Sequence, residues 1–245
     1  MIEIKDLYKS FGDNHVLRGV NLTIPEKKIT VILGRSGVGK SVLLKHIIGL
    51  LKPDSGNIFI DGIDITRASN KQLWNIRRKM AMVFQGAALL DSLPVWQNVT
   101  LALKVHDHMQ EEDLRRIAHD KLTLVEMAGS EELMPSELSG GMKKRVAIAR
   151  ALALEPKYLL FDEPTTGLDP LTAQKINELI KGLQKTLGLT AVIVTHDLQC
   201  TFTVADKIAM LAEGKIIFEG DIEGFKTSNI PLIKQYLATF SITRG

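Results

Sequence analysis

Cysteine is nearly missing from this sequence, which contains only Cys200 among its 245 residues. A single cysteine excludes an internal disulfide framework and any zinc site built on cysteine pairs. We interpret Cys200 as a small buried apolar side chain.

Long apolar runs are also missing. Hydrophobic residues make up 45% and charged residues 24% of the chain, as in ordinary globular proteins, and no run approaches the length that crosses a bilayer. The N-terminus, Met-Ile-Glu-Ile-Lys-Asp, carries acid early and lacks an apolar signal core. We therefore expect a cytoplasmic chain that contacts membranes only through a partner.

The sequence has no strong excess of one charge sign. The formal net charge is +3, and basic residues are mixed with acids, as in Glu111–Arg116, so nucleic acid is not an expected partner. We interpret the short basic run Arg77–Lys79 as a solvated helix end. The length suits one α/β domain with subdomains over residues 1–245.

A glycine-rich loop, Gly-Arg-Ser-Gly-Val-Gly-Lys-Ser, is the most informative segment. It follows the apolar run Ile29–Leu33 and precedes helical spacing over Val42–Leu50, so it joins a buried parallel strand to a helix. Such a loop turns its N–H groups and the positive helix end toward an anion. The expected nucleotide-binding residues are Gly34, Arg35, Ser36, Gly37, Val38, Gly39, Lys40, Ser41 and Val42. The alternative is a glycine-rich turn that contains a lysine by chance.

The remaining pattern predicts an α/β fold with two additions. Alternation over Ile2–Ser10 and Val16–Ile24 indicates an N-terminal antiparallel β subdomain, and helical spacing indicates an inserted helical subdomain over about residues 90–150. A helix is expected over Pro170–Leu187. The tail, residues 221–245, should form a helix that docks on its own domain rather than on a neighbouring subunit.

Polar residues follow several apolar strands, where α/β proteins bind ligands. Asp162 could hold Mg²⁺ or its water, and Glu163 could polarise an attacking water. Gln85 and His196 occupy similar strand ends, although each would usually be structural in isolation. Phe11 is either an anchor under its turn or a plane on which a base stacks.

A second candidate anion site lies at a helix start. Ser139, Gly140 and Gly141 precede a helix that runs through Leu154 and would leave N–H groups exposed there. A plain capping turn would explain an isolated match equally well.

Taken in order, these motifs resemble the nucleotide-binding subunit of ABC transporters. The matching segments are the phosphate loop, Gln85, Leu-Ser-Gly-Gly-Met at Leu138–Met142, Leu159–Glu163, Gly167–Asp169 and His196. The resemblance spans nearly the whole chain, and Leu-Ser-Gly-Gly discriminates best, because other phosphate-loop ATPases lack it. It implies a P-loop NTPase core of the ABC-ATPase type, with ATP and Mg²⁺ as cofactors, in a head-to-tail dimer.

The resemblance also implies a role for each matching residue. Phe11 would stack on adenine, and Ser41, Gln85 and Asp162 would surround Mg²⁺. Glu163 would be the general base, and His196 would contact the γ-phosphate. The charge of Lys40 is expected to lie on the β- and γ-phosphates. The segment Ser139, Gly140 and Gly141 would cap the ATP of the other subunit, with Asp169 at the subunit contact.

Met142 departs from the family pattern, which usually has Gln there, and it cannot donate the hydrogen bond of an amide. Together with Ser41–Leu50 and Gly86–Leu93, it makes the chain similar to the ATPase of Mla/Mce-type phospholipid transporters. The implied partners are a second copy, an integral membrane permease and lipid-binding accessory proteins. The chain would then lie peripherally on the cytoplasmic face of the inner membrane.

The segment around Gly86–Val95 is expected to dock a permease helix. The residues behind this expectation are Leu89, Leu90, Leu93, Val95 and Trp96, which follow Gln85. They could instead form the core of the helical subdomain.

Three other functions use some of the same motifs. An importer ATPase for a small polar solute would share every catalytic residue. A soluble ABC-type ATPase of DNA repair or translation would usually carry two nucleotide domains or a long coiled coil. A small-molecule kinase is disfavoured because Glu163 favours activating water.

Overall fold

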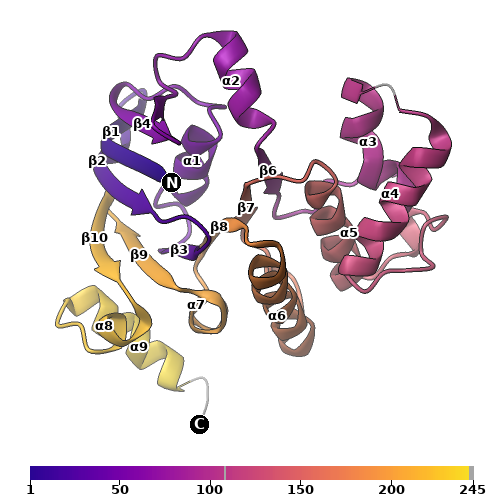
Figure 1. Cartoon of the computed structure of the whole chain (residues 1–245). Helices are drawn as coiled ribbons and strands as arrows, with labels where there is room; N and C mark the ends of the chain where they lie inside the picture. Colours follow the sequence, from indigo (N-terminus) through magenta and orange to yellow (C-terminus); the bar gives the residue numbers. More distant parts are fainter. Residues whose placement is uncertain (108, 243–245) are drawn as a thin grey trace. The chain divides into compact units, whose positions relative to one another are not determined.

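The computed structural model describes residues 1–107 and 109–242 (Figure 1). The chain divides into two compact units. The first comprises Met1–Leu73 and Val192–Gly245, and the second comprises Trp74–Ala191. Within the described residues, no helix has both the length and the apolar composition that a membrane span needs.

The first unit begins with an antiparallel sheet in the order β2-β1-β4-β5. Its strands are β1 (Ile2–Phe11), β2 (Asn14–Ile24), β4 (Ser55–Ile60) and β5 (Ile63–Asp64). The predicted N-terminal antiparallel pair is therefore confirmed. Phe11, which the sequence placed in the turn, is instead the last residue of β1 and pairs with Asn14.

A second set of strands in the first unit has the order β10-β9-β3-β8. These strands are β3 (Ile29–Leu33), β8 (Thr190–Thr195), β9 (Lys207–Ala212) and β10 (Lys215–Gly220). β3 is parallel to β9 and buried at every position, as its unbroken apolar run predicted. Helix α1 (Lys40–Ile47) follows β3 and starts inside the glycine-rich loop.

The C-terminal helices α8 (Ile222–Lys226) and α9 (Pro231–Ile242) pack against α7 (Leu198–Val204) of the same unit (Figure 1). Phe202 of α7 meets Phe225 and Phe240 edge to face, with ring centroids 6.2 and 5.5 Å apart. Phe225 and Ile233 are fully buried. The described part of the tail therefore packs on its own unit, as expected.

The second unit contains the parallel pair β6 (Met80–Val83) and β7 (Tyr158–Asp162). Its helices are α3 (Val95–Asp107), α4 (Glu111–Leu124), α5 (Gly140–Leu152) and α6 (Pro170–Leu187), with a 3₁₀ turn at Pro135–Glu137. Helices α3, α4 and α5 lie together (Figure 1). This unit includes the region expected to be a helical subdomain. The units meet at two points in the chain, one within α2 (Asn70–Arg77) and one within β8, whose first two residues belong to the second unit.

Candidate nucleotide site

The phosphate loop lies in the first unit and leads directly into α1. Gly39 is the N-cap of α1 in the left-handed conformation, with φ 103°, and no side chain caps the helix. The first N–H groups of α1 therefore face the loop, where they can bind an anion. A Cβ atom on Gly39 would lie 2.8 Å from Cγ1 of Val16, so only glycine fits this close approach to β2.

The ammonium group of Lys40 lies inside this loop. Its Nζ donates hydrogen bonds to the carbonyl oxygens of Gly34 at 2.8 Å and Arg35 at 3.0 Å, and the residue is 6% exposed. The backbone N–H of Gly34 donates to the carbonyl of Thr195, the last residue of β8. This bond ties the loop to the strand end that leads to the exposed His196.

Phe11 is the last residue of β1, at the turn into β2. Its side chain is 48% exposed, so it is not a buried anchor. Nζ of Lys9 lies 5.4 Å from the centroid of the Phe11 ring and donates to Asp54 at 2.8 Å. Asp54 also accepts from the backbone N–H of Ser10, and these hydrogen bonds lower its pKa below the usual value. The backbone beside the aromatic ring is thus fixed by a local network.

In the second unit, two strand ends carry the candidate catalytic side chains. β6 and β7 are parallel, with Val83 opposite Phe161, so the residues that follow them lie at the same edge. Gln85 is exposed, Asp162 is half-buried, and Glu163 is buried.

The backbone conformation of Glu163 is unusual for a residue other than glycine. Its φ is 49°, in the left-handed region, and such strain is concentrated at functional sites. The Thr166 hydroxyl donates to Oε2 of Glu163 at 3.3 Å, and the Thr166 N–H donates to its carbonyl. The carboxylate is therefore oriented from within its own turn.

Lys144 is a neighbour of this edge that the sequence did not single out. Its Nζ donates to the carbonyl of Gln85 and lies 3.5 Å from the carbonyl of Glu163. Burial lowers the pKa of Lys144, while the nearby charges of Glu163 and Asp162 raise it. One signal was available, because Lys144 lies at helical spacing among the buried residues of α5.

The start of α5 is close to the start of α6. Ser139 caps α5, and its Oγ accepts from the N–H of Met142 at 3.3 Å. A Cβ on Gly141 would lie 2.6 Å from Cγ2 of Thr172, so the absence of a side chain allows the two helix starts to approach. Asp169 caps α6 by accepting from Leu171 and Thr172, and these bonds lower its pKa.

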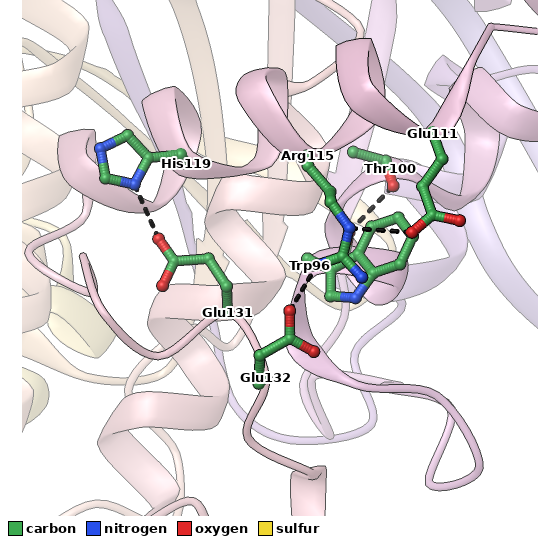
Figure 2. Close-up of polar contacts among 7 residues, drawn as sticks. All are labelled: Trp96, Thr100, Glu111, Arg115, His119, Glu131 and Glu132. Atoms are coloured by element: carbon green, nitrogen blue, oxygen red, sulfur yellow. Dashed lines mark hydrogen bonds and ion pairs between the residues drawn. The ribbon is translucent and has the colours of Figure 1, made fainter.

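The expectation that Val95 and Trp96 form an exposed docking surface is wrong. Both residues are buried, at 0% and 3% exposure. The Arg115 guanidinium lies 4.1 Å from the Trp96 ring centroid and is held by Glu111 and Glu132 (Figure 2). Trp96 belongs to the core of the helical region, which was the alternative to docking, and the Arg115 guanidinium covers its ring.

The exposed apolar side chains at this edge are Phe84 and Leu90, at 41% and 44%.

The predicted site residues are divided between the units. The first unit brings together the phosphate loop and His196, with Phe11 on β1. The second contains Gln85, Asp162 and Glu163, and it also carries the Ser139–Gly141 segment.

Comparison with known proteins identifies related sequences over nearly the whole chain. Residues 17–166 match the profile of the ABC transporter family. The chain is 42% identical over 237 residues to the intermembrane phospholipid transport system ATP-binding protein MlaF of Haemophilus influenzae, covering 97% of this chain and 90% of that protein. It is also 42% identical over 236 residues to the probable ribonucleotide transport ATP-binding protein mkl of Mycobacterium tuberculosis. That match covers 96% of this chain but spans only 66% of the mycobacterial protein.

Solved structures show the same fold. A dimeric post-hydrolysis state of the ATP-binding cassette MJ0796, bound to ADP and Pi, superposes with a TM-score of 0.81 at 36% identity. The superposition covers 91% of this chain and 99% of that cassette. The predicted P-loop core of the ABC-ATPase type is confirmed.

Proposed function

The chain belongs to the ABC transporter family, and we propose that it hydrolyses ATP to power a membrane permease that moves phospholipids between membranes. The match to MlaF carries this proposal, because it extends over 90% of that protein rather than over the shared nucleotide motifs alone.

ATP is the expected nucleotide, and the phosphate loop fits its phosphates. Lys40 already holds a positive charge against the loop carbonyls, and the uncapped start of α1 offers N–H donors. The exposed ring of Phe11 is suited to stacking on adenine. Residues Gly34 to Val42 would therefore enclose the phosphates, with His196 directed at the γ-phosphate.

Mg²⁺ would neutralise charge on the phosphates when bound. The proposed ligands are the Ser41 hydroxyl, the Gln85 amide and the Asp162 carboxylate, directly or through water. All three offer oxygen, which is the donor that Mg²⁺ prefers.

Glu163 is the proposed general base. A carboxylate can accept a proton from an attacking water, and Thr166 restricts where this carboxylate points. Lys40 and His196 would stabilise charge on the transferred phosphate.

A second copy of the chain is the proposed partner for hydrolysis. Ser139 and Gly140 are exposed at the start of α5, where their N–H groups can reach an anion. Leu171, two residues after Asp169, is 74% exposed and would be covered at the proposed subunit contact. The dimeric MJ0796 cassette supports the same arrangement here.

The permease would dock on Phe84 and Leu90, on either side of the exposed Gln85. The chain would then lie peripherally on the cytoplasmic face of the inner membrane, with lipid-binding accessory proteins completing the system. A second candidate is an importer ATPase for a small polar solute, and the mycobacterial relatives, described as probable ribonucleotide transport proteins, are consistent with a polar substrate.

Purification from native membranes in mild detergent, followed by mass spectrometry of proteins and lipids, tests both candidates. A permease, a lipid-binding partner and phospholipid are expected together. A permease with a solute-binding protein and no lipid would favour the importer, and recovery without any membrane protein would contradict transport.

A matched pair of variants tests the docking surface. Leu90→Asp should reduce permease recovery without loss of folding, because Leu90 is 44% exposed. Leu187→Asp changes a leucine of the same unit with 41% exposure and should leave recovery unchanged. Equal recovery for both variants would contradict docking at Leu90.

A further inference from the structure

We propose that Lys144 is a positioning residue that holds the main chain of both Gln85 and Glu163 and joins them to helix α5. The inference deepens the proposed ATPase function and rests on it.

The ammonium group of Lys144 is placed where it can act on both residues at once. Its Nζ donates to the Gln85 carbonyl and lies 3.5 Å from the Glu163 carbonyl. The residue is 6% exposed, and burying an ammonium group costs free energy unless it is well hydrogen-bonded. An ammonium has three donors and can therefore serve two carbonyls together.

The backbone is strained at Glu163 and in the loop that follows Gln85. Glu163 has φ 49°, and Ala87 and Ala88, which follow Gln85, have φ 61° and 51°. Side-chain-bearing residues in this region are strained and persist only where surrounding contacts hold them. Lys144 supplies such a contact at Glu163, the proposed base, and its hydrogen bond to the Gln85 carbonyl fixes the main chain of the proposed metal ligand just before the strained loop.

The rest of the loop after Gln85 is held separately. Arg150 donates to the carbonyls of Ala87 and Ala88, both at 2.6 Å. The buried Asn98 accepts from the Leu90 N–H at 2.8 Å and donates to the Leu90 carbonyl at 3.1 Å. Removal of the Lys144 ammonium should therefore release Gln85 and Glu163 without releasing the whole loop.

Ser139, the N-cap of helix α5, is proposed to meet the ATP of the other subunit. Lys144 lies on the second turn of the same helix. A shift of α5 caused by contact at Ser139 would be passed to the main chain of Gln85 by Lys144, while Arg150 of the same helix would carry Ala87 and Ala88 with it. Lys144 thus links the nucleotide of one subunit to the proposed metal ligand of the facing site.

The test compares Lys144→Met with Lys143→Met, the same change at the preceding residue of α5, which is only half-buried. Mn²⁺ binding to the ADP-loaded chain is measured by electron paramagnetic resonance, and ATP binding is measured in EDTA. Loss of a residue that orients metal ligands typically weakens metal binding by 10–100-fold, so we expect about tenfold weaker Mn²⁺ binding in Lys144→Met. ATP binding in EDTA should stay within about twofold, because the phosphate loop makes the contacts that remain. Lys143→Met should match the wild type in both measurements.

Two further variants separate positioning from folding. Lys144→Arg keeps a charged donor and should restore most of the Mn²⁺ affinity, whereas Lys144→Gln, with a neutral donor, should give an intermediate value and is the substitute if the methionine variant does not fold. Unchanged Mn²⁺ affinity in Lys144→Met, or in Lys144→Gln in its place, would overturn the inference, even if the melting temperature fell. If the wild type itself showed no Mg²⁺-dependent ATP hydrolysis, the proposed function would fail instead.

Discussion

Replacing Glu163 with glutamine tests the proposed base with little disturbance of the structure. Glutamine has the same size, and its amide oxygen can still accept the hydrogen bond that Thr166 donates to Oε2 at 3.3 Å. The amide cannot take a proton from water. General-base catalysis contributes about 10²–10⁴-fold, so the activation free energy should rise by roughly 3–5 kcal/mol.

The assay measures phosphate release at saturating ATP and Mg²⁺ alongside equilibrium ATP binding. Turnover by Glu163→Gln should fall by roughly a hundredfold or more, while ATP affinity stays close to that of the wild type. Glu155 provides a matched control in the same unit, because it has a similar backbone, with φ 48°, but an exposed side chain. Glu155→Gln should hydrolyse ATP normally. Turnover within tenfold of the wild type by a folded Glu163→Gln would refute the assigned role.

The other predictions concern binding, pH and stability. Lys40→Ala should weaken ATP binding by roughly tenfold or more in calorimetry, because charge-assisted hydrogen bonds contribute about 1.5–3 kcal/mol, whereas Lys45→Ala at an exposed position of α1 should not. His46 is fully buried, and burial lowers its pKa below the ordinary 6.5, so the unfolded chain binds more protons there than the folded chain as the pH falls. Its stabilising contribution is complete above pH 6.5 and decreases as the pH falls below that value; His46→Asn should flatten this part of the melting-temperature profile, and an unchanged slope would contradict the assignment. Phe225→Ala should lower the free energy of unfolding by about 3–5 kcal/mol in denaturant titrations, because the side chain is fully buried; a loss below about 1 kcal/mol would mean that the tail is not docked.

Local chemistry explains which parts of the fold could be predicted. Helix α6 begins at Pro170 and ends at Leu187, as expected, because Asp169 caps its start and Gly188 takes the left-handed conformation at its end. The strand, loop and helix around Lys40 were also predicted from local features. The apolar run of β3 indicates a buried strand, and Gly39 has the left-handed backbone that favours glycine.

Features that depend on distant segments were missed. Lys144 contacts the Gln85 carbonyl, 59 residues away in the chain, and a main-chain acceptor leaves no sequence pattern. Trp96 follows an exposed loop, and the sequence left its burial only as an alternative because the Arg115 side chain that covers it lies 19 residues further along the chain. The helical subdomain expected over about residues 90–150 was not divided into its separate helices, although the acidic start of α4 at Glu111 was an available signal for the end of α3 and the start of α4.

The main-chain contacts of the loop after Gln85 have a consequence for how this protein can evolve. Lys144, Arg150 and Asn98 bond to backbone atoms of the loop, which are the same whichever residue occupies each position. An exposed side chain such as Leu90 can therefore be exchanged to match a different membrane partner without altering the backbone path. A substitution in the loop requires no compensating substitution at Lys144, Arg150 or Asn98. In an alignment of many descendant sequences, these three positions should therefore not co-vary with the loop positions whose backbone they contact.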